Sequence, residues 1–86
     1  MVQDELLIEQ LNQKQAGAFK ILFGRFYRYL VLYAMKRVER QEIAEDIVQD
    51  LFVQIWERDT LYSSYYGFKN FLYNSVKNAS LDYLKH

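Results

Sequence analysis

Apolar residues recur at intervals of three and four along most of this chain, which is the period of an amphipathic helix. The pattern predicts four helices, over residues 3–13, 16–38, 41–58 and 68–84. No segment shows the alternation of a β-strand, and the chain holds no proline and only three glycines. We therefore expect an all-α fold, a compact bundle of about four helices.

Each predicted helix has an apolar stripe that we expect to face a shared core. In chain order, the stripe residues are Leu6, Leu7, Ile8 and Leu11; Phe19, Leu22, Phe23, Phe26, Leu30, Tyr33, Ala34 and Arg37; Ala44, Ile47, Val48, Leu51 and Ile55; and Phe68, Leu72, Ser75, Val76, Ala79 and Tyr83. Gly24 interrupts the second helix, where a glycine costs about 1 kcal/mol relative to alanine. We expect this glycine to allow a close helix contact.

The third predicted helix has a second, polar face opposite its core stripe. Val53 falls in the middle of that face and Trp56 lies at its margin. The polar residues around them are Glu42, Asp46, Gln49, Asp50 and Glu57. A small apolar centre inside a charged rim is typical of a protein-binding patch. The alternative is a tolerated surface valine, with Trp56 in the core.

An aromatic segment joins the third helix to the fourth. Residues 59–73 contain six rings, those of Tyr62, Tyr65, Tyr66, Phe68, Phe71 and Tyr73. We expect a loop over residues 59–67, which also holds Ser63 and Ser64, with Gly67 separating the loop from the helix. Exposed rings stack on single-stranded bases at about 1–3 kcal/mol each, and nearby lysines meet phosphates. The alternative is that the rings close a small core, as we expect of Phe68 and Phe71.

The charges alternate in blocks along a chain whose formal net charge is zero. The net charge is −2 over residues 1–15, +5 over 16–40, −5 over 41–60 and +2 over 61–86. A neutral total argues against a general nucleic-acid binder. The blocks indicate two surfaces of opposite preference, one for a basic partner and one for an acidic partner.

The sequence offers little for catalysis or cofactor binding. It has no cysteine, its only histidine is His86, and it has neither a glycine-rich phosphate loop nor a zinc-protease motif. Carboxylate pairs such as Asp46 with Asp50 lack an apolar pocket that would separate acid from base. We expect no enzyme activity and no metal or organic cofactor. No apolar run approaches membrane-spanning length, and the acidic N-terminal segment is no secretory signal, so we expect a cytoplasmic protein without membrane insertion.

Two segments resemble region 2 of bacterial sigma factors, most of all the extracytoplasmic-function (ECF) group. They are residues 43–58, IAEDIVQDLFVQIWER, and residues 68–86, FKNFLYNSVKNASLDYLKH. The earlier run AGAFKILFGRFYRYLVLYA agrees as well. The resemblance covers nearly the whole chain in order, and the AEDIVQD run followed by tryptophan is its most specific part.

The resemblance implies a helical domain that binds the clamp helices of the RNA polymerase β′ subunit. It also implies melting of the promoter minus-ten element and capture of the non-template strand. Polymerase contacts are expected at Asp46, Gln49, Asp50, Val53 and Trp56. DNA contacts are expected at Ser63, Ser64, Tyr65, Tyr66, Lys69, Asn70, Tyr73, Asn74 and Lys77. An anti-sigma factor that covers the same surfaces is a further expected partner.

The chain departs from the family in two respects. The family often has arginine where this chain has Asn74, Lys77 and Lys85, so fewer bidentate phosphate contacts are expected. Residues 1–86 are expected to form a single region 2 domain without the region 4 domain, and to bind duplex promoter DNA weakly. Two alternatives stay open: a helical protein-interaction module without a DNA role, and a general duplex DNA binder.

Overall fold

The computed structural model describes residues 2–85, and over these residues the chain forms four helices and no strand. The helices are α1 (Val2–Asn12), α2 (Ala16–Val38), α3 (Gln41–Glu57) and α4 (Tyr65–Lys85). The predicted all-α bundle of four helices is therefore confirmed.

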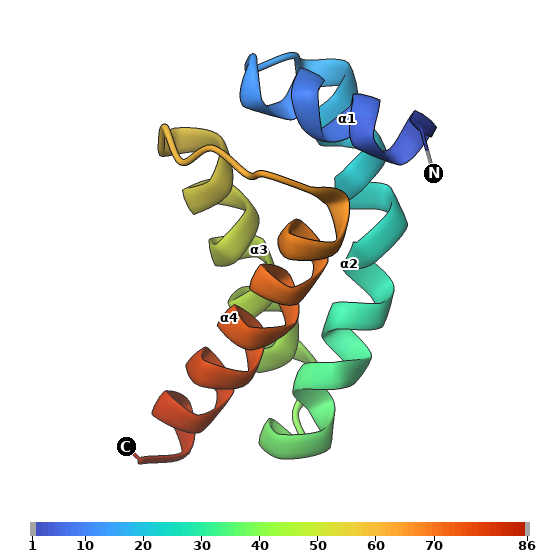
Figure 1. The fold of residues 1–86 in the computed structure, drawn as a ribbon. Helices are drawn as coiled ribbons and strands as arrows, with labels where there is room; N and C mark the ends of the chain where they lie inside the picture. The colour runs from blue at the N-terminus through green and yellow to red at the C-terminus, as the bar shows by residue number, and fades with distance from the viewer. Residues whose placement is uncertain (1, 86) are drawn as a thin grey trace.

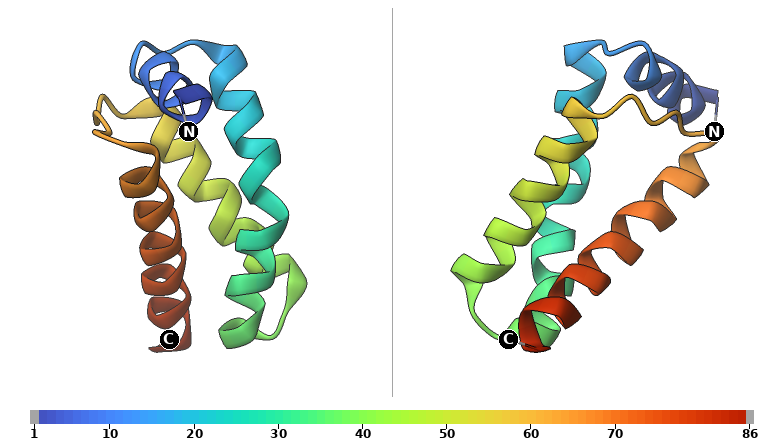
Figure 2. Two further views of the ribbon diagram at one scale, coloured as in Figure 1. Left: turned by 45° about the vertical axis from the view of Figure 1, so that its right-hand side comes forward. Right: turned by 90° about the vertical axis from the view of Figure 1, so that its left-hand side faces the viewer.

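The longest helix, α2, packs against both α3 and α4 (Figure 1). The short helix α1 lies across one end of this bundle, where it contacts α2 and α4. The α3–α4 loop (residues 58–64) crosses the same end beside α1, as both views of Figure 2 show. The loop and α1 are therefore neighbours, although most of the chain separates them in sequence.

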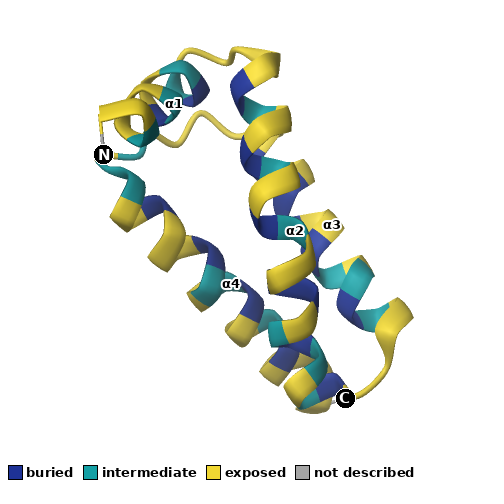
Figure 3. Ribbon diagram, turned by 90° about the vertical axis from the view of Figure 1, so that its right-hand side faces the viewer, coloured by how far each residue is buried: buried dark blue, intermediate teal, exposed yellow. Residues whose placement is uncertain are grey.

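A single core runs along the bundle and receives side chains from every helix. Figure 3 shows buried positions repeating along the inward side of each helix, as amphipathic packing requires. Phe68, Leu22 and Leu30 are the largest side chains that are fully buried. Phe52 is also buried, although the predicted stripe of the third helix left it out.

The ends of two apolar stripes were predicted wrongly. Leu6 is 49% exposed, whereas α1 buries Ile8 and Leu11 and packs Leu7 partly against the core. Tyr83 is 39% exposed because it lies beyond Ser80, the last buried residue of α4. The buried Ser80 hydroxyl donates a hydrogen bond to the Val76 carbonyl at 2.7 Å.

The fourth helix begins three residues before its predicted start, and a serine cap explains why. The Ser64 hydroxyl accepts a hydrogen bond from the Gly67 N–H at 2.9 Å, and the Ser64 carbonyl accepts one from the Phe68 N–H at 3.0 Å. This is the geometry of a helix N-cap. Gly67 therefore lies inside the first turn, and the prediction that it separates loop from helix was wrong.

The prediction that Gly24 allows a close helix contact was also wrong. A Cβ atom built on Gly24 would meet no atom within 4 Å. At Gly67, in contrast, a Cβ would lie 3.1 Å from the Ser64 hydroxyl oxygen. The glycine with a close neighbour is therefore at the start of α4 and not in α2.

Candidate functional site

The outer face of α3 places the five predicted polymerase contacts on one exposed surface. Asp46, Gln49 and Asp50 are exposed, and Val53 is 53% exposed in their midst. Trp56 is 38% exposed, so it lies at the margin of the face and not in the core. The alternative that buried Trp56 is therefore wrong.

This face borders an aromatic hollow of about 390 Å³ between α2 and α3. Its lining residues are Phe19, Phe23, Gln49, Phe52, Val53, Trp56 and Glu57. The Phe19 ring lies 5.0 Å from the Trp56 ring, and the Phe23 ring lies 4.9 Å from the Phe52 ring, centroid to centroid. The apolar centre of the face is therefore a cluster of rings and not an isolated valine.

Phe19 and Phe23 are candidate site residues that the sequence pattern placed in the core. Both are only partly buried in the structure, and both line the hollow. Their spacing in α2 indicates an inward direction but not how completely α3 covers them. The charged and amide groups of α3 close the hollow's rim, where the Gln49 amide donates to the Tyr27 hydroxyl at 3.1 Å.

Most of the predicted DNA contacts lie on α4 and not on a loop. Only Ser63 and Ser64 precede the helix, and the latter is its cap. The exposed members of the set are Ser63, Tyr66, Lys69, Asn70, Asn74 and Lys77. Tyr66 is 73% exposed and presents its ring to solvent.

The remaining members of the set already have partners within the protein. The Tyr65 hydroxyl accepts a hydrogen bond from the Arg25 guanidinium at 3.1 Å, and its ring lies 5.9 Å from Phe26. Tyr73 packs edge-on against Tyr33, at 5.0 Å between centroids. These rings are therefore less available than Tyr66 for stacking on a base.

Tyr62 anchors the α3–α4 loop to the core. Its ring lies 4.9 Å from Phe68 and 5.4 Å from Phe71, and burial raises the pKa of its phenol. Leu61 next to it is 73% exposed. The sequence pattern did not single out Leu61, because helical periodicity says nothing about which way a loop side chain points.

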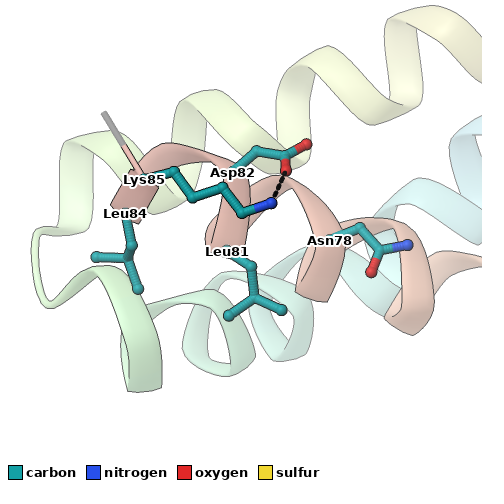
Figure 4. A pocket seen from close by; sticks show the side chains of 5 residues that line it. All are labelled: Asn78, Leu81, Asp82, Leu84 and Lys85. Atoms are coloured by element: carbon teal, nitrogen blue, oxygen red, sulfur yellow. Dashed lines mark ion pairs between the residues drawn. The ribbon is translucent and has the colours of Figure 1, made fainter.

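Another hollow, of about 630 Å³, lies near the C-terminal end of α4. Figure 4 shows its five lining side chains, Asn78, Leu81, Asp82, Leu84 and Lys85. Asp82 and Lys85 form an exposed ion pair with 3.9 Å between Oδ1 and Nζ. No residue of either predicted binding surface lines this hollow.

The part of the chain that the structure describes has no helix long and apolar enough to cross a membrane. Within residues 2–85, no three histidine or acidic side chains gather in a way that could hold a metal ion.

Comparison with protein families identifies one match, to the family model described as Sigma-70 region 2, over residues 22–86. The match includes α3, α4 and residues 22–38 of α2. It covers both exposed surfaces except Phe19, which lines the aromatic hollow. It does not include α1. Searches of curated proteins and of solved structures found no match to this chain.

Proposed function

This chain belongs to the sigma-70 region 2 family of transcription initiation domains, and we propose how its two exposed surfaces divide that role. The family role is RNA polymerase binding and promoter recognition, without catalysis. We propose that the outer face of α3 binds the β′ clamp helices. We propose that the α3–α4 loop and the exposed face of α4 hold the non-template strand of the minus-ten element.

The charge and shape of the α3 face support its proposed role. Exposed acids, among them Asp46 and Asp50, suit a basic partner, and charge complementarity favours a fast and correctly oriented encounter. The aromatic hollow beside Val53 and Trp56 offers a recess that an apolar side chain of the partner would fill and desolvate. This combination on one face is the observation that carries the proposal.

The chemistry of the α4 surface supports the DNA assignment. Tyr66 offers an exposed ring for stacking, and Lys69 and Lys77 offer charges for phosphates. Ser63 and Asn70 offer polar groups for base edges. A base that leaves the stack needs both an aromatic wall and polar partners.

The finer assignments are proposals as well. The AEDIVQD run followed by Trp56 favours the ECF group, and an anti-sigma factor would bind by covering the same two surfaces. We propose that the protein acts in the cytoplasm, where its polymerase partner works.

A pull-down with purified β′ clamp helices tests the α3 surface. We expect wild-type protein to be retained and Asp50→Arg to be lost, because the new cation faces a basic partner. Asp82→Arg is the matched control: it makes the same reversal at an exposed site in the last turns of α4, away from this face. If wild type and Asp50→Arg are retained equally, or neither is, the polymerase assignment fails.

Fluorescence titration tests the DNA surface against the competing interpretations. We expect the protein to bind single-stranded DNA more tightly than the matched duplex. Preference for duplex would favour a general DNA binder. Retention by clamp helices without binding to either DNA would favour a protein-interaction module.

A further inference from the structure

The α3–α4 loop has almost no backbone support of its own. Residues 59–63 make no hydrogen bond to another backbone group in the part of the chain that the structure describes. A loop of this kind loses much conformational entropy when it adopts one shape. Something outside the loop must therefore hold the shape that the structure shows.

The side chain of Asn12, the last residue of α1, provides that support. Its amide nitrogen donates to the Tyr62 carbonyl at 2.8 Å, and its amide oxygen accepts from the Tyr62 N–H at 3.0 Å. One side chain thus satisfies both backbone groups of a residue fifty positions away, as a neighbouring strand would. Because the pairing is bidentate, it sets the orientation of the Tyr62 peptide as well as its position.

Two further side chains hold the ends of the loop. At its start, the Lys14 ammonium donates to the carbonyl oxygens of Trp56, at 2.6 Å, and Arg58. At its end, the Glu5 carboxylate accepts from the Tyr65 N–H at 3.0 Å. A carboxylate at a helix N-terminus also interacts favourably with the helix dipole. α1 and the turn after it therefore hold the loop at its start, middle and end.

A fourth side chain, that of Arg25, links α1 to the first ring of α4. Arg25 of α2 donates from one nitrogen to the Asp4 carboxylate at 2.9 Å and to the Tyr65 hydroxyl at 3.1 Å. These two hydrogen bonds, that of Tyr65 first, raise the pKa of the Arg25 guanidinium. Tyr65 is held by this hydrogen bond, and the adjacent Tyr66 side chain points to solvent.

We propose that Asn12, with Glu5, is a positioning residue for single-strand binding: α1 preforms the α3–α4 loop for the strand that α4 holds. This inference rests on the proposed DNA function of the loop and α4. It assigns a role to α1, which lies outside the residues that match the family. Asn12 touches no nucleotide in this scheme and acts through Tyr62.

The expected effect follows from the population of the preformed loop. If the loop without Asn12 adopts its binding shape about one tenth of the time, the apparent dissociation constant rises about ten-fold. The α3 face does not depend on the loop, so binding to clamp helices should not change. A loss of general stability would instead weaken both activities.

The test compares Asn12→Leu with Gln13→Leu. Leucine keeps the approximate shape of asparagine but removes both hydrogen bonds to Tyr62. Gln13 is the neighbouring exposed amide, and its side chain bonds only Gln15, so it serves as the control. The probe is a labelled single strand about twelve nucleotides long, selected on wild-type protein from a random-sequence pool.

We expect Asn12→Leu to bind this strand about ten-fold more weakly than wild type, with clamp-helix affinity unchanged. The free energy of unfolding should fall by about 1.4 kcal/mol, the same ten-fold change, and no more. Amide hydrogen exchange at Tyr62 should be faster in this variant and unchanged in Gln13→Leu. Equal strand affinity in the two variants, or equal loss of both activities in Asn12→Leu, would overturn the inference.

If Asn12→Leu fails to fold, Glu5→Ala replaces it, because the Glu5 carboxylate is exposed and does not belong to the core. We expect Glu5→Ala to lower strand affinity about three-fold. An unchanged strand affinity in this variant would overturn the inference. If wild type selects no strand, the proposed DNA function fails. Exchange at Tyr62 then tests only whether Asn12 holds the loop, which faster exchange in Asn12→Leu supports and unchanged exchange rejects.

Discussion

Adjacent tyrosines in the aromatic segment have opposite environments. Tyr65 is held by Arg25 and packs near Phe26, whereas Tyr66 is 73% exposed. The two positions lie in the first turn of α4, where consecutive residues point about 100° apart. One of them therefore faces the bundle and the other faces solvent.

We predict that Tyr66→Ala and Tyr65→Ala separate binding from folding. Tyr66→Ala should weaken single-strand binding by about 1–3 kcal/mol, the value of one stacked ring, and leave the urea midpoint unchanged. Tyr65→Ala should lower the free energy of unfolding by about 1–3 kcal/mol, because a half-buried ring and its hydrogen bond are lost. Fluorescence titration and urea unfolding measure the two quantities. A destabilised Tyr66→Ala would mean that its ring belongs to the core.

Burial of tyrosine hydroxyls predicts a loss of stability in alkali. Burial raises the pKa of the phenols of Tyr62 and Tyr73 above their ordinary value of about 10. Their neutral form is favoured in the folded state, so this stability is complete below pH 10 and is lost as the pH rises through the folded pKa. Urea unfolding from about pH 8 to about pH 11 should show a falling free energy of unfolding. The fall should be smaller in Tyr62→Phe. An identical decline in the variant would exclude Tyr62 as a source.

At the scale of the helices, the start of α4 determines which loop and first-turn side chains are exposed. α4 begins at its Ser64 cap, and its first turn then carries Tyr65, Tyr66 and Gly67. The hydroxyl of Ser64 is consequently occupied by the Gly67 N–H. Ser63 is the serine that remains exposed for a ligand.

Gly24 of α2 and Gly67 of α4 should respond differently to alanine. Gly24→Ala should raise the free energy of unfolding by about 1 kcal/mol, because the added Cβ meets no atom within 4 Å and alanine favours the helix. Gly67→Ala should gain less, because its Cβ would lie 3.1 Å from the capping oxygen of Ser64. Thermal unfolding of both variants measures the difference. An equal gain at both positions would show that the cap yields without cost.

Across the whole molecule, the charge blocks of the sequence belong to different surfaces. The acidic block of residues 41–60 includes the exposed carboxylates of α3, whereas the cations proposed to meet DNA are Lys69 and Lys77 of α4. The zero net charge of the chain thus conceals a division between a face for a basic partner and a face for phosphates.

Two lysines predict a shallow salt dependence of single-strand binding. The logarithm of the association constant should fall with the logarithm of salt concentration with a slope of about −1.4, because each neutralised phosphate contributes about −0.7. Lys77→Gln should reduce the slope to about −0.7. Titrations over a range of salt concentrations measure both slopes. A much steeper slope in wild type would mean that the basic residues of α2 also contact the strand.

Much of the fold was predictable because helical packing imposes a periodic pattern of apolar residues on neighbouring positions of the sequence. The second helix was predicted with its observed bounds, and Val53 was predicted to be exposed on the polar face of the third. Both follow from the positions of apolar residues within a few turns. The start of α4 was missed because Gly67 was taken to separate loop from helix, although Ser64 before it is a preferred N-cap residue.

The candidate site was predictable in part, for the same physical reason. The residues of the α3 face were found from the helical wheel, but Phe19 and Phe23 were assigned to the core because one helix does not reveal how far another covers it. The assignment of particular residues to polymerase or DNA stays a prediction until the variants above are measured.

The sequence by itself determined the helices and which side of each faces inward, because a period of 3.6 residues is a local property. Only the tertiary structure decided which polar groups meet across the bundle. Asn12 reaches Tyr62 from fifty residues away, and no local pattern encodes that pairing. The shape of the α3–α4 loop therefore depends on where α1 packs, and so does the surface that the loop presents.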